Sequence, residues 1–529
     1  MDFLIRLVKK IIFTDKLFQI PRINLFKRLG SLKVPPEMSD EKPSPQSTSE
    51  ELIAVRREKL GKLKELGIDP YGAKFKVTTT PGDLKAEFSD DKSVTIAGRL
   101  LAIRDMGKSV FATLGDAHGR IQIYINKKEV PELDWSVYQL LDLGDWVGVS
   151  GSTFTTGKGE SSVKVSSLTM LSKALRPMPD KWHGLSDRET KYRKRHLDLM
   201  SNQPSADLFI IRSQIVAEIR NFLHERGYLE VETPMLHDVA GGAAARPFQT
   251  HHNALDMPLT MRIAPELHLK RLLVGGLTKV FELNRNFRNE GISRRHNPEF
   301  TMLEAYQAFG DFEIMADLVE EMVCHLAEKF FGTLQIEHQD ENGEHVRTLD
   351  LSRPWKRTPY QDLIKGVAGD DWFDLSPDER RAKAQSEFKL EIHDHLEDYE
   401  VTQQVFEKLV EEHTFDPCFV THVDSKLIPL AKENPENPKV IDVYELIING
   451  QEISPGYSEL NDPDVQRRRL EEQSGGEAQE IDEDFVESLE HGMPPAGGIG
   501  IGIDRLIMLL TGAPTIRDVV LFPQLKRKD

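Results

Sequence analysis

The stretch KVFELNRNFRNEGISRRHNPEFTMLEAYQAFG, residues Lys279–Gly310, decides the fold of this chain. Its two ends, Val280–Leu283 and Phe300–Phe309, predict strands, and alternation along the second places Met302, Glu304 and Tyr306 on one face. The polar connector between them carries the cationic side chains of Arg285, Arg288, Arg294, Arg295 and His296 against only Glu290 and Glu299. A solvated hairpin would explain these charges, but such a loop also suits a polyanion, because Arg grips carboxylates and phosphates through paired hydrogen bonds.

The size and composition of the chain describe a multidomain globular protein. A length of 529 residues predicts two to four domains, and 39% hydrophobic and 29% charged residues are typical of globular chains. The formal net charge of −18 means that any contact with RNA must use local basic patches. Cys324 and Cys418 lie far apart and form no CxxC pair, which favours a reducing, cytoplasmic location. No apolar run approaches the ~20 residues that span a bilayer, so we expect no integral membrane association.

Residues 1–48 form a basic and polar extension that we expect to be disordered. Residues 1–37 contain eight Lys or Arg and three acidic residues, which is foreign to the acidic body of the chain. This segment fits an amphipathic membrane-surface segment, a transit-like presequence, an unstructured extension, or upstream sequence translated from a misplaced start before Met38. Residues 49–72 follow with one amphipathic helix, Ser49–Leu66, ended by Gly67.

Residues 73–176 predict a small β-barrel. Five short strands are separated by Gly and Asp turns: Val94–Ala102, Ser109–Leu114, Ile121–Ile125, Trp146–Gly151 and Ser162–Ser167. This number of strands in under a hundred residues suggests a barrel of the OB type, which binds oligonucleotides on its sheet face. Phe111 and Gln122 fall on neighbouring strands and would suit stacking on a base and reading its edge, although a strand Phe is more often part of a core.

A Pro-rich linker, residues 177–190, separates the barrel from residues 191–529, which we predict to form a second domain. Phe209–Arg226 predicts a long helix, followed by a strand at Tyr228–Val231. Gly241–Pro247 is a loop of small residues where a ligand could approach the backbone. Leu259–Leu267 predicts a further strand, and this strand carries Glu266.

The C-terminal part of the chain contains spaced acids and a Gly-rich segment. Glu445, Glu452 and Glu459 fall on predicted adjacent strands, where inward carboxylates are costly unless they hold a metal or a cationic ligand. The acidic segment Glu477–Glu490 predicts a solvated helical face. Gly497–Leu510 predicts a strand that runs into a helix, and it fails the GxGxxG dinucleotide pattern.

Several of these segments resemble the class II aminoacyl-tRNA synthetases, in the form found in lysyl enzymes. FRNEG followed by RHNPEFTMLEAY resembles motif 2 (279–310), the helix and strand at 209–236 resemble motif 1, and 497–510 resembles motif 3 with its Arg505. IAGRL…GKSVFATLGDAHGRIQIYI looks like the anticodon-binding barrel. The resemblance covers about residues 45–526. It implies an α+β multidomain fold, with an N-terminal OB-type β-barrel and a class II antiparallel-sheet catalytic domain flanked by helices, and a homodimer formed through motif 1.

The resemblance also implies an activity and a set of site residues. The activity is ATP-dependent activation of L-lysine and its transfer to tRNA(Lys), with Mg²⁺ as cofactor. The catalytic residues would be Arg288 and Arg505, and ATP would be bound by Arg288, Glu290, His296, Phe300 and Arg505. Lysine would be bound by Gly242, Glu266, Arg288, Glu304, Tyr306 and Glu459, the metal by Glu445 and Glu452, and anticodon bases by Phe111, Gln122 and Glu160.

Two departures and two alternatives accompany this interpretation. Pro455 stands where lysyl enzymes usually carry Asn, and Lys426–Ala431 replaces the usual Glu-x-Ser-Pro-Leu-Ala, which puts fine substrate affinity in doubt. One alternative is a related ligase that attaches a lysine-like amino acid to a protein, but such enzymes lack the barrel. The other is a non-catalytic tRNA-binding regulator, which should have lost Arg288, Arg505 or the metal acids.

Overall fold

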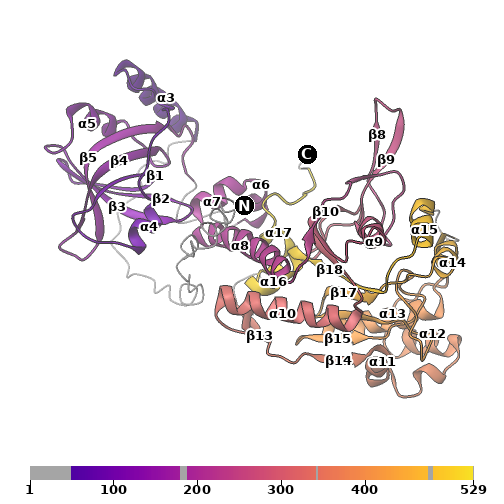
Figure 1. Ribbon diagram of the computed structural model, residues 1–529. Helices are drawn as coiled ribbons and strands as arrows, with labels where there is room; N and C mark the ends of the chain where they lie inside the picture. The colour runs from indigo at the N-terminus through magenta and orange to yellow at the C-terminus, as the bar shows by residue number, and fades with distance from the viewer. Residues whose placement is uncertain (1–48, 179–186, 341–343, 475–480, 528–529) are drawn as a thin grey trace, which may run out of the picture. The chain divides into compact units, whose positions relative to one another are not determined.

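The computed structural model describes residues 49–178, 187–340, 344–474 and 481–527 (Figure 1). The predicted disorder of residues 1–48 and most of the predicted linker therefore lie outside the described residues. The chain divides into two compact units, with the boundary between Ile210 and Ile211.

The first unit is built on a closed five-stranded barrel, as the alternation predicts. Its strand order is β1-β2-β3-β5-β4, in which only the β3–β5 pair is parallel. The strands are longer than predicted: β1 (Ser93–Asp105), β2 (Ser109–Asp116), β3 (Gly119–Asn126), β4 (Trp146–Thr155) and β5 (Ser161–Ser172). Alternate residues such as Val110, Ala112 and Ile123 fill the barrel interior, which leaves the intervening side chains on its outer face.

The first unit also contains five helices within its described residues. They are α3 (Ser49–Glu65), α4 (Pro81–Ala86), α5 (Glu132–Gln139), α6 (Arg188–Arg193) and α7 (Arg195–Ser201). Of these, α4 and α5 pack on barrel strands. Helix α3 occupies the predicted span, but its apolar face is largely exposed, since Leu63 is buried whereas Leu52 and Val55 are not. It is attached through Arg56, which donates hydrogen bonds to the carbonyls of Leu143, Ala174 and Arg176. Helix α6 begins inside the segment that we predicted to be linker, because Asp187 caps its N-terminus.

The second unit is organised around an eight-stranded sheet with the order β14-β15-β16-β17-β18-β11-β10-β6 (Figure 1). Six central strands are antiparallel, as predicted, while both edge pairs are parallel. The bounds are β6 (Leu229–Glu230), β10 (Lys279–Phe287), β11 (Glu299–Ala308), β14 (Lys356–Pro359), β15 (Cys418–Thr421), β16 (Val443–Ile447), β17 (Glu452–Ser458) and β18 (Ala496–Gly502). Five further strands form two small sheets: β7 (Leu236–His237), β8 (Gln249–His252), β9 (Met257–Met261), β12 (Gln335–Gln339) and β13 (His345–Asp350).

Helices pack on this sheet and carry part of the site. Helix α8 (Gln203–Glu225), which crosses the boundary between the units, begins six residues before the predicted start. The others are α9 (Glu266–Val274), α10 (Phe312–Phe331), α11 (Tyr360–Ala368), α12 (Pro377–Ser386), α13 (Asp398–Leu409), α14 (Pro463–Ser474), α15 (Glu483–Glu490), α16 (Ile503–Thr511) and α17 (Ile516–Val519). Helix α10 contacts β16, β17 and β18, and α9 contacts β10 and β11.

Three predictions in this unit need correction. The strand expected over Leu259–Leu267 ends at Met261, and Glu266 is the first residue of helix α9. The helix forms because Leu269 and Leu273, four residues apart, share one buried face. The strand expected at Tyr228–Val231 keeps only two residues. Helix α15 is not a purely solvated face, since Phe485, Val486 and Leu489 are buried.

Candidate active site

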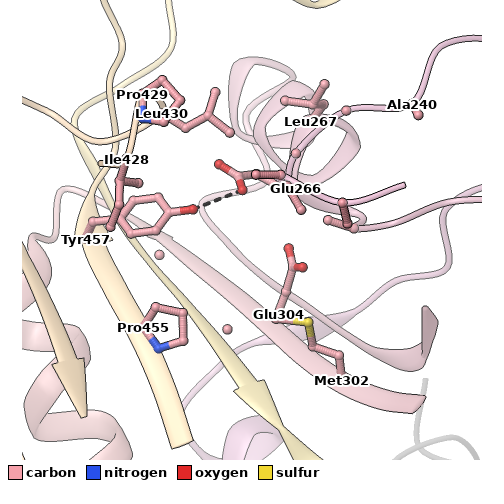
Figure 2. A pocket seen from close by; sticks show the side chains of 18 of the residues that line it. Ala240, Glu266, Leu267, Met302, Glu304, Ile428, Pro429, Leu430, Pro455 and Tyr457 are labelled. Carbon is pink, nitrogen blue, oxygen red and sulfur yellow. Dashed lines mark hydrogen bonds between the residues drawn. The ribbon is translucent and has the colours of Figure 1, made fainter. Parts of the chain in front are cut away.

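A cavity of about 990 Å³ lies over β11, β17 and β18, in the second unit (Figure 2). Its wall includes Gly242, Glu266, Arg288, Glu290, Glu304, Tyr306, Glu445, Glu452 and Pro455. A smaller cavity of about 200 Å³ shares Arg288, Glu290 and Glu452 with it and adds His296, Phe300 and Arg505. The structure thus brings together every predicted residue of the amino-acid, ATP and metal sites except Glu459, which lines neither cavity.

Glu304 and Tyr306 form one acidic corner of the larger cavity. Both side chains stand on the same face of β11 because they are two residues apart. The Tyr306 hydroxyl donates a hydrogen bond of 3.0 Å to Glu304 Oε2. Burial, and then the charge of Glu266, raise the pKa of Glu304 to about 8. A cationic ligand in this corner would offset the cost of ionising the buried Glu304 carboxylate.

Glu266 faces the same space from helix α9. Figure 2 shows the Glu304 carboxylate extending toward Glu266, whose own carboxylate is directed toward Tyr457 and is hydrogen-bonded to it. The Tyr457 hydroxyl donates to Glu266 Oε2 at 2.9 Å, and Lys270, one helical turn further on, donates to Oε1 at 2.8 Å. Two protein donors therefore fix the orientation of Glu266.

Glu459 follows directly after β17 and is buried behind the cavity wall. Its Oε2 lies 2.5 Å from the Nζ of Lys270, which is also fully buried. Its Oε1 occupies the space beside Gly498, where an added Cβ would lie 1.9 Å from that oxygen. The glycine at 498, within the Gly-rich segment noted in the sequence, is therefore required for Glu459 to occupy this position.

Gly242 brings the small-residue loop against this acidic group. Its φ is +85°, a conformation that glycine adopts without strain. A Cβ at this position would lie 3.1 Å from the Cβ of Glu266 and 3.2 Å from that of Ala264. The close approach leaves the loop backbone available to a ligand beside Glu266.

Arg288 lies where the two cavities meet. Its guanidinium is 5.2 Å from the centroid of the Phe300 ring, and its Nε donates a long hydrogen bond of 3.4 Å to the carbonyl of Ile263. The contact with an aromatic face restrains the guanidinium without consuming its donors. A carboxylate in the larger cavity and a phosphate in the smaller one can both reach it.

His296 and Arg505 form the far side of the smaller cavity. Arg505 donates to the carbonyl of Glu452 at 2.8 Å and lies 2.9 Å from His296 Nε2. Burial, and then the Arg505 charge, lower the pKa of His296. A neutral imidazole accepts from Arg505 at Nε2 and keeps its proton on Nδ1, 2.8 Å from Ser293 Oγ. This pair fixes the Arg505 guanidinium beside the space that Phe300 lines.

Glu445 and Glu452 lie on the neighbouring strands β16 and β17 and line the larger cavity. Burial, and then the charges of Glu452 and Glu411, raise the pKa of Glu445 to about 8. Within the described residues, no group of three or more His, Cys, Asp or Glu side chains forms a complete metal cage. Two repelling carboxylates fit Mg²⁺, because this ion is commonly held by one or two carboxylates together with substrate phosphates.

Several residues of this region escaped the sequence analysis. Lys270 and Glu411 contact predicted site residues but belong to no quoted motif, whereas Tyr457 lies in the stretch Asp442–Asp462 and received no predicted role. A buried pair, Arg262 and Glu282 at 2.6 Å, supports the strands beneath the cavity. On a helix, the four-residue spacing of Glu266 and Lys270 indicates an ion pair. The alternation in the sequence predicts a strand there instead, so this pair was missed.

The candidate nucleic-acid residues lie on the outer face of the barrel. Phe111 faces Tyr124 across the β2–β3 pair, with ring centroids 5.0 Å apart, and Tyr124 meets Phe154 at 6.0 Å. Gln122 donates to Ser162 Oγ at 2.9 Å, and the exposed Glu160 lies 3.8 Å from Lys85. Tyr124 and Phe154 extend the aromatic surface that Phe111 alone suggested.

Comparison with known families agrees with this arrangement. Residues 187–526 match the family described as tRNA synthetases class II (D, K and N), and residues 94–171 match the OB-fold nucleic acid binding domain. Together with the antiparallel sheet and the cavity upon it, these matches define a class II aminoacyl-tRNA synthetase with an OB-fold domain.

Similar proteins narrow the class further. The chain is 48% identical over 493 residues to a lysine–tRNA ligase of Staphylococcus epidermidis, which covers 90% of this chain and 98% of the relative. It is 49% identical over 494 residues to a lysine–tRNA ligase of Staphylococcus haemolyticus and 48% identical over 493 residues to one of Staphylococcus aureus, with the same coverage. The chain belongs to the lysyl-tRNA synthetase family. In the part of the chain that the structure describes, no helix is long and apolar enough to cross a membrane.

Proposed function

We propose that the chain activates L-lysine with ATP and transfers it to the 3′ end of tRNA(Lys). The observation that carries this proposal is that one cavity has buried carboxylates at one end and an arginine at the other. Glu266 and Glu304 face one space, and Arg288 stands where that space meets the smaller cavity. The acids suit the ammonium groups of lysine, and the Arg suits its carboxylate.

The first step joins two anions, so the site supplies electrostatic stabilisation and orientation rather than a covalent nucleophile. The lysine carboxylate attacks the α-phosphorus of ATP, a bond forms to the carboxylate oxygen, and pyrophosphate leaves. Arg288 bridges the attacking carboxylate and the α-phosphate. Phe300 stacks on adenine, Glu290 accepts a hydrogen bond from it, and His296 and Arg505 hold the phosphates.

Lysine lies with its ammonium groups among Glu266, Glu304 and Tyr306, beside the backbone of Gly242, and Glu459 contributes its negative charge from behind the cavity wall. Glu445 and Glu452 would hold Mg²⁺, which when bound would neutralise phosphate charge. The position of both carboxylates on neighbouring strands, in the wall of the same cavity, supports this assignment.

The barrel recognises the anticodon, with Phe111 stacking on a base and Gln122 and Glu160 reading base edges. Its presence favours tRNA over a protein acceptor. We also propose a homodimer formed through the motif 1 region. The two described cysteines are free and buried, which supports a reducing, cytoplasmic location.

Lysine-dependent exchange of pyrophosphate into ATP tests the activation step. The purified protein should support exchange with lysine and not with aspartate or asparagine. Exchange with either of those amino acids and not with lysine contradicts the assignment. Attachment of lysine to tRNA by the same preparation, with a protein acceptor as the comparison, tests the second step.

A further inference from the structure

Lys270 is a fully buried cation that belongs to none of the predicted sites. Its Nζ lies 2.8 Å from Glu266 Oε1, 2.5 Å from Glu459 Oε2 and 3.4 Å from the carbonyl of Leu430. The contacts with Glu266 and Leu430 are hydrogen bonds, the second of them long, and the contact with Glu459 is a close ion pair. Burial by itself lowers the pKa of Lys270, but the carboxylates of Glu266 and Glu459 raise it above its ordinary value. Lys270 is therefore charged.

The surroundings of Lys270 keep it out of the space that a ligand would fill. The cavity wall includes Glu266, Tyr457 and Leu430, whereas Lys270 does not line the cavity. The Tyr457 ring stands with its centroid 5.8 Å from Nζ, and its hydroxyl holds the other oxygen of Glu266. Lys270 thus acts on a ligand only through the two carboxylates that it contacts.

We propose that Lys270 is a positioning residue of the lysine pocket: it fixes Glu266 and Glu459 and sets the charge that the pocket presents. This inference rests on the proposed role of these acids in binding lysine. With lysine bound and all three acids ionised, Glu266, Glu304 and Glu459 carry three formal negative charges and Lys270 carries one positive charge, which leaves two. Two is the number of ammonium groups on lysine, whose carboxylate is paired separately with Arg288.

The loss of Lys270 removes its contacts with Glu266 and Glu459 and also removes its positive charge from the pocket. Three buried carboxylates without an internal cation repel one another, so one of them takes up a proton or turns away. A protonated or displaced acid is a poorer partner for an ammonium. Binding of lysine should weaken, whereas ATP, which contacts the other end of the site, should bind as before.

The test is steady-state exchange with the full chain carrying Lys270→Met, compared with Lys270→Arg and with Lys408→Met. Lys408 is a matched control, because it forms an exposed ion pair with Glu412 at the same four-residue spacing and 2.7 Å. For Lys270→Met we expect the KM for lysine to rise at least tenfold. The KM for ATP should stay within twofold, and kcat should fall by less than KM rises. Lys270→Arg should recover part of the loss, and Lys408→Met should match the wild type.

A merely structural ion pair would give a different pattern. A folded Lys270→Met protein with an unchanged KM for lysine, or with equal rises in KM for lysine and ATP, overturns the proposal. Should Lys270→Met fail to fold, the double variant Lys270→Met/Glu459→Gln removes the orphaned charge. That variant should fold, and because Glu266 and Glu304 still leave two negative charges, its KM for lysine should be lower than that of Glu459→Gln alone, in which Lys270 leaves only one. Equal KM values in these two variants overturn the proposal. Absence of lysine-dependent exchange in the wild type would instead refute the proposed function.

Discussion

Arg212 and Asp504 join two helices that are almost three hundred residues apart in sequence, with a nitrogen–oxygen distance of 2.7 Å. Arg212 belongs to α8, in the region that resembles motif 1, and Asp504 belongs to the first turn of α16, beside Arg505 of motif 3. The other Asp504 oxygen accepts the backbone N–H of Thr301, in motif 2, at 2.8 Å. One buried carboxylate therefore connects all three motifs.

Replacing Arg212 with Met should destabilise the second unit strongly. The Asp504 side chain is 2% exposed, and removal of its partner leaves an uncompensated buried charge, which costs about 3–5 kcal/mol. Chemical denaturation of the two proteins, followed by tryptophan fluorescence, measures the change. Lys408→Met breaks an exposed pair and should change stability by less than about 1 kcal/mol. Equal effects of the two substitutions would show that Asp504 does not depend on Arg212.

Arg288→Ala should reduce lysine-dependent exchange by a factor on the order of a hundred or more, because an electrostatic contact to the transition state is lost. Arg288→Lys should recover only part of the activity, since a single ammonium cannot bridge two anions as a guanidinium does. The melting temperature should change little, because among the described residues the Arg288 side chain donates a single, long hydrogen bond. Near-normal exchange in Arg288→Ala would mean that the bridging role belongs to another residue.

Binding of lysine should release protons near neutral pH. The pKa of Glu304 is about 8 in the free protein, because it is buried beside Glu266, and a bound ammonium lowers it. Binding is then favoured above pH 8, and the affinity should fall by up to about tenfold per pH unit below that value. Calorimetry at pH 7 in two buffers of different ionisation enthalpy measures the released protons. Glu304→Gln should bind lysine more weakly and lose this proton release. An unchanged release in that variant would assign the titration to another group.

The predictions from the sequence were most accurate for elements that a short, local pattern of residues defines. Alternation located β10, β11 and the barrel strands, and the matched motifs supplied residues that the structure gathers around one pair of cavities. The alternation in LTMRI predicts a strand that continues to Glu266. The Leu residues that follow have helical spacing, and this part of the chain forms helix α9 instead. The partners of Asp504 and Glu459 could not be predicted, because these pairs join residues that only the tertiary fold brings together.

Substitutions in the barrel test whether tRNA charging can be impaired while amino-acid activation is retained. Phe111 and Gln122 lie in the first unit, on its outer face, while the cavities lie in the second. Phe111→Ala should therefore lower kcat/KM for tRNA charging at least tenfold, since stacking on a base is worth ~1–3 kcal/mol, and should leave pyrophosphate exchange almost unchanged.

Gln122→Ala should act in the same direction as Phe111→Ala, and Leu133→Ala, an exposed apolar residue of α5, serves as the control that affects neither reaction. Charging and exchange are compared for each variant at saturating ATP and lysine, with tRNA varied in the charging reaction. Because Phe111 also packs on Tyr124, the melting temperature of each variant must be compared with the wild type. Equal losses of charging and exchange in a stably folded Phe111→Ala protein would mean that the barrel supports the catalytic unit rather than recognising tRNA.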